Sequence, residues 1–119
     1  MKDQNLLELA ALSVDMPVDG WSMHREKGMR MVNSDREFIR YWNPLVSDGD
    51  ALRLATKLGF TINIGNTSTI VSHNHIDTIE TIETNVSTKL NSQTNIDSAT
   101  RRAIVRAAAL AAKKNKCNQ

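Results

Sequence analysis

Near the start of the chain, apolar residues recur three and four positions apart, which is typical of one buried helix face. These positions are Leu6, Leu7, Ala10, Ala11 and Val14. Asp3 precedes them and is the expected N-cap, because its carboxylate can accept a hydrogen bond from a free backbone N–H of the first turn. The pattern predicts a helix over residues 3–14.

Residues 21–42 alternate between apolar and polar side chains, as strands with one buried face do. Turn-forming residues at 26–28 and 33–35 separate the β-prone pieces. The segment is therefore expected to form a short antiparallel meander. Pro44 should end its last strand, because proline has no N–H for a sheet ladder.

A second helix is expected directly after this meander. Ser47 or Asp48 can cap its N-terminus, and with Ser47 as N-cap, Asp50 falls at the N3 position of a capping box. Gly59 suits a left-handed helix end. The two acidic residues are expected to cap the helix, because a calcium loop would need further ligands and a glutamate after them. The predicted apolar face consists of Ala51, Leu52, Leu54, Ala55 and Leu58.

Two strands should follow this helix. Residues 60–64 alternate strictly, so Phe60, Ile62 and Ile64 are expected to face the core. Residues 69–72 form the next strand candidate. His73 and His75 come after it, and two histidines at alternate strand positions share a face and can reach one metal ion. A solvent-exposed histidine pair in a loop is the competing expectation.

Residues 76–84 repeat isoleucine at every third position, a period that fits neither a helix nor a strand. Their β-branched content favours a strand, and neither of its faces is clearly apolar. The segment is expected to be an edge strand or a protruding arm with Asp77, Glu80 and Glu83 exposed. These acids either discourage edge-to-edge aggregation or recognise a basic partner.

The last helix is expected over residues 97–114, after a polar loop at 85–95, with Asn95 or Asp97 as its cap. Its basic residues fall on one arc and its apolar residues on the opposite arc. The basic arc consists of Arg101, Arg102, Arg106, Lys113 and Lys116. The apolar arc consists of Ala103, Ile104, Ala107, Ala108, Leu110 and Ala111. The basic arc is either a nucleic-acid surface or a solvated helix face.

Composition limits the class of protein. A chain of 119 residues with 40% hydrophobic and 24% charged residues fits a single globular domain, here 1–119 with a polar loop or arm at about 73–96. Residues 98–119 carry six basic and no acidic residues, a charge of +6, so the remaining 97 residues sum to −4 within the net charge of +2. Neither a membrane span nor a signal peptide is expected. One cysteine, Cys117, suits a reducing cytoplasm.

Three stretches resemble the phage ABA-sandwich family, small proteins of tailed bacteriophages and prophages. The central one covers residues 42–45, 48–55 and 57–58, with Trp42-Asn43-Pro44-Leu45 at its start. The others are 6–11 and 99–109, which resemble the opening and closing helices of the family. Residues 70–96 depart from the family pattern. The family name implies helices on both faces of a sheet, and it brings no catalytic motif with it.

The predicted fold class is α+β, a mostly antiparallel sheet of four to six strands packed with three helices. No nucleophile–base pair, phosphate loop or convincing metal cluster is evident, so we predict a protein that is not an enzyme and uses no cofactor. The first hypothesis is a phage accessory protein in the host bacterial cytoplasm. It would bind a host or phage protein. One such partner is a host-defence component, which this protein would block as an anti-CRISPR-like inhibitor. Its candidate binding residues are Asp77, Glu80 and Glu83.

Two alternatives stay open. A nucleic-acid-binding protein would use Arg101, Arg102, Arg106 and Lys113, although no aromatic residue among them offers a base a stacking surface. A metal- or small-ligand-binding protein would be centred on His73 and His75. No membrane partner is expected, and the exposed edge strand is compatible with a symmetric homodimer.

Overall fold

The computed structural model describes residues 2–21, 28–65, 67–73, 76–81 and 92–117, the last with side chains at 96–113. Its elements follow the order predicted from the sequence. The helices are α1 (Asp3–Ser13), α2 (Asp48–Leu58) and α3 (Ser92–Cys117). The strands are β1 (Val18–Trp21), β2 (Met29–Val32), β3 (Phe38–Trp42), β4 (Thr61–Ile64), β5 (Ser68–His73) and β6 (Ile76–Thr81).

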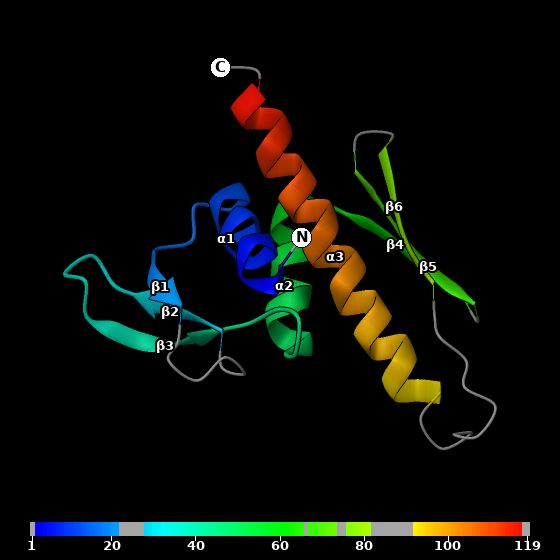
Figure 1. Ribbon diagram of the computed structural model, residues 1–119, viewed down its shortest axis with the longest axis horizontal. Helices are drawn as coiled ribbons and strands as arrows, with labels where there is room; N and C mark the ends of the chain where they lie inside the picture. Colours follow the sequence, from blue (N-terminus) through cyan, green and yellow to red (C-terminus); the bar gives the residue numbers. More distant parts are fainter. Residues whose placement is uncertain (1, 22–27, 66, 74–75, 82–91, 118–119) are drawn as a thin grey trace.

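Three helices lie between two antiparallel sheets, as Figure 1 shows. One sheet has the order β1-β2-β3 and the other the order β4-β5-β6, each with three strands. The α+β class with three helices and antiparallel strands is therefore confirmed. The strands form two sheets instead of one, because α2 separates β3 from β4 and each meander pairs only with itself among the described residues. The helices thus occupy the middle layer, whereas the family name implied that they would cover both faces of a sheet.

The core is centred on α3, which crosses the molecule and contacts α1, α2, β5 and β6. The predicted stripe of α1 packs against it, with Leu7 and Ala10 fully buried. Small alanines on α3 allow the helices to approach closely. Val105 and Ala109 are buried as well, whereas Leu110, which was predicted to face the core, is 46% exposed. A single apolar arc was the wrong expectation, because α3 is packed on several sides.

The ends of α2 form as predicted. The Ser47 side chain accepts a hydrogen bond from the Asp50 N–H at 3.2 Å, so Ser47 is the N-cap. Gly59 closes the helix with φ 70° and ψ 38°, and the Phe60 N–H donates to the Ala55 carbonyl, as in a Schellman motif. The capping box is incomplete, because Asp50 does not return to Ser47.

The other predicted caps are wrong. The N-cap of α1 is Lys2 without a side-chain bond, and Asp3 lies inside the first turn. α3 begins at Ser92, so Asn95 and Asp97 lie within the helix. Ser, Asn and Asp are all common N-cap residues, and several of them cluster near the start of α3, so residue type alone did not identify where the helix begins. Most of the predicted 85–95 loop lies outside the described residues.

The β1-β2-β3 meander agrees with the prediction, although β1 begins at Val18. Its second turn is held by the Asn33 side chain, which accepts hydrogen bonds from the N–H groups of Asp35 and Glu37. Residues 26–27 of the first turn lie outside the described residues. Met29 and Trp42 face each other across β2 and β3, and both are buried in the core.

The β4-β5-β6 sheet turns a mixed polar and apolar face toward α3. Val71, Thr69 and Thr78 are buried there. The Thr100 hydroxyl of α3 donates to the Ile96 carbonyl at 2.8 Å, so the Thr69 hydroxyl is the donor in its 3.1 Å contact with Thr100. No helix in the part of the chain described is long and apolar enough to cross a membrane.

Candidate functional site

The predicted basic face of α3 is largely paired inside the molecule. Arg101 donates to Asp48 Oδ1 at 2.6 Å and to the Leu45 carbonyl at 2.9 Å, and its side chain is only 15% exposed. Arg101 therefore anchors the start of α2 to α3. Lys113 is exposed on the same helix.

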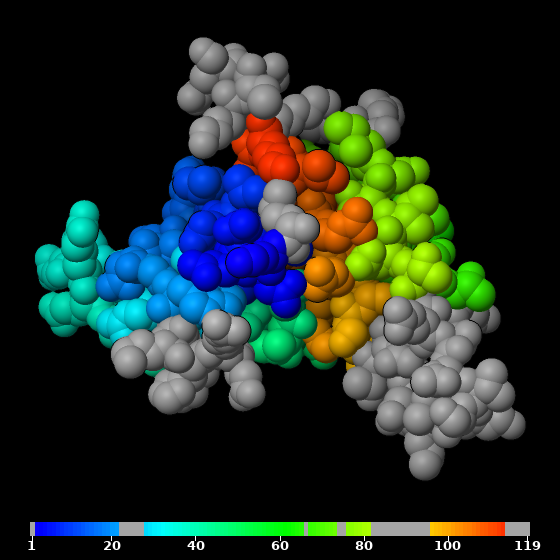
Figure 2. Space-filling view, in the orientation of Figure 1, coloured from blue at the N-terminus to red at the C-terminus, as the bar shows by residue number. Residues whose placement is uncertain are grey.

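Two further arginines of this face meet the predicted acidic arm. Glu80 of β6 accepts from Arg106 at 2.6 Å and lies 3.3 Å from Arg102, which also reaches Asp3 of α1 at 3.2 Å. Figure 2 shows α3 (orange) as a band between α1 (blue) and the β4-β5-β6 sheet (yellow-green), the layout that these contacts bridge. The basic face of α3 and the acidic arm, which were predicted as separate surfaces, are therefore joined by ion pairs at Glu80.

The acidic arm is only partly exposed. The Glu80 side chain is 21% exposed, so the expectation that it projects into solvent is wrong: its position on β6 faces α3. Asp77, on the opposite face of β6, is exposed and accepts a hydrogen bond from Ser72 at 2.7 Å. Glu83 lies outside the described residues.

The histidine pair is described only in part. His73 is the last residue of β5, half-buried, with its ring edge-on to Phe60 at 5.1 Å between centroids. A solvent-exposed loop position is thus the wrong expectation for His73. His75 lies outside the described residues. Within the described ranges, no group of three or more His, Cys, Asp or Glu residues is placed to hold a metal ion.

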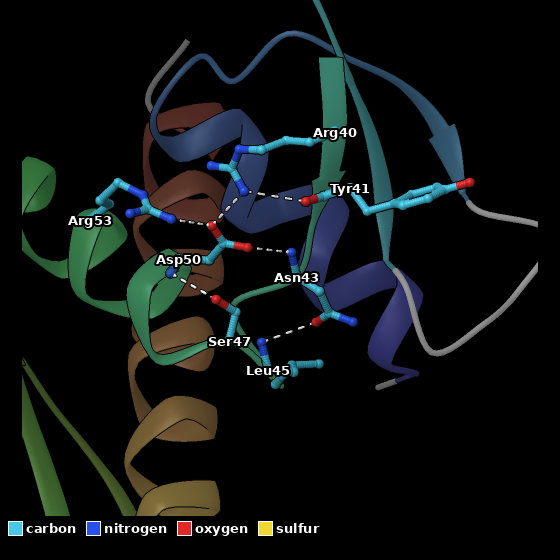
Figure 3. A network of polar contacts seen from close by, with 7 residues as sticks. All are labelled: Arg40, Tyr41, Asn43, Leu45, Ser47, Asp50 and Arg53. Atoms are coloured by element: carbon cyan, nitrogen blue, oxygen red, sulfur yellow. Dashed lines mark hydrogen bonds and ion pairs between the residues drawn. The ribbon is translucent and has the colours of Figure 1, made fainter. Parts of the chain in front are cut away.

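A buried carboxylate joins β3 to α2. Asp50 Oδ2 accepts the Asn43 backbone N–H at 2.9 Å, and Oδ1 accepts from both Arg40 (3.0 Å) and Arg53 (2.7 Å), as Figure 3 shows. Burial by itself raises the pKa of Asp50. The hydrogen bonds from Asn43, Arg53 and Arg40 outweigh it, so its pKa lies below the ordinary value. Asp50 is therefore ionised at neutral pH.

An apolar groove lies between α2, β4 and α3, with a volume of about 350 Å³. Leu52 is 63% exposed and Ile64 is 55% exposed at this groove, whereas the sequence placed both on core-facing sides. Ile64 shares its strand face with Ile62, as periodicity indicated, but Ile64 borders the open groove. Leu52 lies at the edge of the buried stripe of α2, which consists of Ala51, Leu54 and Ala55. The lining residues are Asp48, Ala51, Leu52, Ile62, Ile64, Ile96, Asp97, Thr100, Arg101 and Ile104.

The groove is the feature of the site that sequence reasoning missed. The sequence signal for it was limited to two aliphatic residues, Leu52 and Ile64, at the margins of predicted apolar faces. Chemically, it presents aliphatic side chains with an Asp48–Arg101 ion pair at its rim. This arrangement suits the binding of an apolar side chain.

Comparison of the chain with protein-family models, with curated proteins and with solved structures gave no match.

Proposed function

We propose that this protein is a non-enzymatic bacteriophage accessory protein that acts by binding a protein partner, and that the α2–β4–α3 groove is its contact surface. The phage context rests on the resemblance of residues 42–45, 48–55 and 57–58, together with 6–11 and 99–109, to the phage ABA-sandwich family. The choice of a protein partner rests mainly on the groove with its two exposed aliphatic residues, Leu52 and Ile64. The expected partner is a host factor or a host-defence component of the kind that an anti-CRISPR-like inhibitor binds.

The energetics support contact with a protein. Covering Leu52 and Ile64 would contribute about 1–2 kcal/mol each from apolar burial alone. Protein interfaces place apolar anchors in pockets surrounded by polar residues, and Asp48 and Arg101 supply such a rim here. Val46, on the turn before α2, is also 61% exposed and adds apolar surface close to this helix.

Nucleic-acid binding through α3 is the second candidate, and the internal ion pairs weaken it. Electrostatic affinity for nucleic acid comes from cations that neutralise phosphates. Arg101, Arg102 and Arg106 already neutralise Asp48, Asp3 and Glu80. Binding a phosphate would require these pairs to open or to share their arginines.

A matched pair of leucines tests the groove. Leu52 on α2 and Leu12 on α1 are 63% and 62% exposed, and each has an acidic residue four positions earlier, Asp48 and Glu8. Leu52→Lys and Leu12→Lys therefore add the same charge at equally exposed helix positions, but only Leu52 lines the groove. Each variant and the native protein would be used as bait in bacterial lysate with and without nuclease treatment, and the affinity for protein captured after nuclease treatment would then be measured.

We expect Leu52→Lys to weaken partner binding about tenfold or more, which corresponds to about 1.4 kcal/mol, and Leu12→Lys to leave it unchanged. Thermal unfolding of both variants checks that the fold is kept. Equal binding by native protein and Leu52→Lys would remove the groove from the proposal. Recovery of nucleic acid alone, lost after nuclease treatment, would favour the second candidate.

A further inference from the structure

The Asp50 network contains more positive than negative charge. Arg40 from β3 and Arg53 from α2 donate to the same oxygen, Oδ1 of Asp50 (Figure 3). The other oxygen is occupied by the Asn43 N–H. One buried carboxylate therefore holds two guanidinium groups, and the cluster has a net charge of +1.

The other ion pairs in the part of the chain described are balanced. Arg30 pairs with Asp19, and Arg101 pairs with Asp48. On α3, two arginines share two carboxylates, Asp3 and Glu80. The surplus at Asp50 is thus specific to Arg40 and Arg53.

Both guanidinium groups are accessible although their shared carboxylate is not. The Arg40 side chain is 43% exposed and that of Arg53 is 64% exposed, against 3% for Asp50. A guanidinium has five N–H donors in a planar fork. Asp50 uses one nitrogen of each arginine, and the Arg40 nitrogen it uses also donates to the Tyr41 carbonyl at 3.3 Å. Donors on both groups therefore stay available on the solvent side.

The backbone also positions Arg53. Its guanidinium lies against Gly49, where a Cβ atom would come within 3.3 Å of Nη2 and 3.4 Å of Nη1. Any side chain at position 49 would crowd the group. Glycine at this position leaves room for the guanidinium, and the bond of this group to Asp50 at 2.7 Å orients it, which reduces the side-chain entropy lost when a ligand binds.

We propose that Arg40 and Arg53 form a carboxylate-binding site that takes an Asp or Glu side chain of a protein partner. A planar carboxylate fits arginine forks through paired charge-assisted hydrogen bonds. A single surplus charge favours one carboxylate over a nucleic-acid backbone, whose electrostatic affinity grows with the number of phosphates contacted.

Arg53 follows Leu52 directly on α2, but neighbouring residues of a helix do not face the same side, and neither Arg40 nor Arg53 lines the groove. The carboxylate site and the groove are therefore separate surfaces, which a protein partner would contact with different residues. That the carboxylate belongs to a protein rests on the proposed function, whereas the carboxylate site itself does not.

The test is an NMR titration that follows the side-chain Nε–Hε signals of Arg40, Arg53 and Arg30. The probe is acetyl-Leu-Glu-amide, and its neutral match is acetyl-Leu-Gln-amide at equal ionic strength. We expect saturable shifts at Arg40 and Arg53 with the Glu peptide, no such shifts with the Gln peptide, and none at Arg30, which has a carboxylate of its own. In Arg53→Gln the saturable shift at Arg40 should be lost, whereas Arg30→Gln should keep it.

Equal shifts at Arg30, shifts that do not saturate, or equal responses to both peptides would overturn the site. Saturation by inorganic phosphate at lower concentration than by the Glu peptide would overturn its assignment to a protein carboxylate. The comparison of Arg40 and Arg53 with Arg30, and of the two peptides, is made in the native protein and decides the site whether or not the two variants fold. It is also independent of the leucine variants, so failure of the site and failure of the groove can be told apart.

Discussion

The backbone N–H of Asn43 donates to Oδ2 of Asp50 across 2.9 Å, and both residues are buried. This bond fixes the residue after β3 to the first turn of α2. Asn43 in turn accepts the Leu45 N–H on its side-chain oxygen and the Ser47 N–H on its carbonyl. The connection between the first sheet and α2 therefore depends on one carboxylate.

We expect Asp50→Ala to lower the free energy of unfolding by about 2–3 kcal/mol, because the buried Asn43 N–H would lose its acceptor. Asp48→Ala is the matched control, since it removes an acid from the same helix turn. Asp48 is 76% exposed, and its loss should cost about 1 kcal/mol or less. Urea unfolding of both variants measures the difference, and similar losses would show that Asp50 is not special.

The same carboxylate makes stability depend on pH. Its pKa in the folded protein lies below the ordinary value of 3.8, since the hydrogen bonds outweigh burial. Its contribution is therefore complete above the unfolded pKa and is lost as pH falls through the folded pKa. We expect the native protein to lose more stability than Asp50→Asn when the pH falls from 5 toward 2. Thermal midpoints across that range test this, and parallel curves would contradict it.

Local signals in the sequence predicted the elements well. The caps at Ser47 and Gly59 depend on backbone geometry within a few residues, so the order of residue types was sufficient to place them. The stripe of α1 was also correct, because a helix with one apolar face needs to bury that face. The α+β class followed from the order of these elements.

Contacts between residues far apart in the chain could not be predicted from the sequence. Arg106 and Glu80 are 26 positions apart, and nothing in either segment indicates that β6 lies beside α3. Periodicity likewise shows that Ile64 shares a strand face with Ile62 and that Leu52 lies beside the apolar stripe of α2, but not where the core ends. The groove and the neutralised basic face both arise from this packing of elements.

Gly28 is a position where only glycine fits. Its φ of 93° is unfavourable for other residues, and a Cβ atom there would lie 2.6 Å from Cβ of Asn43 and closer still to the Trp42 carbonyl. Gly28→Ala should cost about 3 kcal/mol or more, from backbone strain and overpacking together. Gly59→Ala, at φ 70° with no atom within 4 Å of the added Cβ, isolates the strain and should cost about 1 kcal/mol. Denaturant midpoints compare the two, and a smaller loss for Gly28→Ala would argue against this close packing.

Glu80 should contribute to stability in a salt-dependent way. Glu80→Gln removes a partly buried charge that Arg102 and Arg106 share, and we expect it to cost about 1 kcal/mol at low salt. Asp77→Asn makes the same charge change on the exposed face of β6 and should cost less. Unfolding at low and high salt measures both, and the difference between the variants should shrink as salt screens the pairs. A loss for Asp77→Asn as large as that for Glu80→Gln would be the contrary result.

The two variants also decide how far internal pairing suppresses nucleic-acid binding. Glu80→Gln removes the carboxylate partner of Arg106 and leaves Arg102 with Asp3 alone, whereas Asp77→Asn adds the same net charge on the opposite face of the sheet, away from this helix. We expect Glu80→Gln to bind a duplex oligonucleotide more tightly than the native protein, with a salt dependence steeper by about one to two phosphate contacts. Asp77→Asn should differ little from the native protein. Fluorescence anisotropy at several salt concentrations provides the affinities. Tight, steeply salt-dependent binding by the native protein itself would instead mean that its arginines contact phosphates despite their ion pairs, and would favour the nucleic-acid candidate.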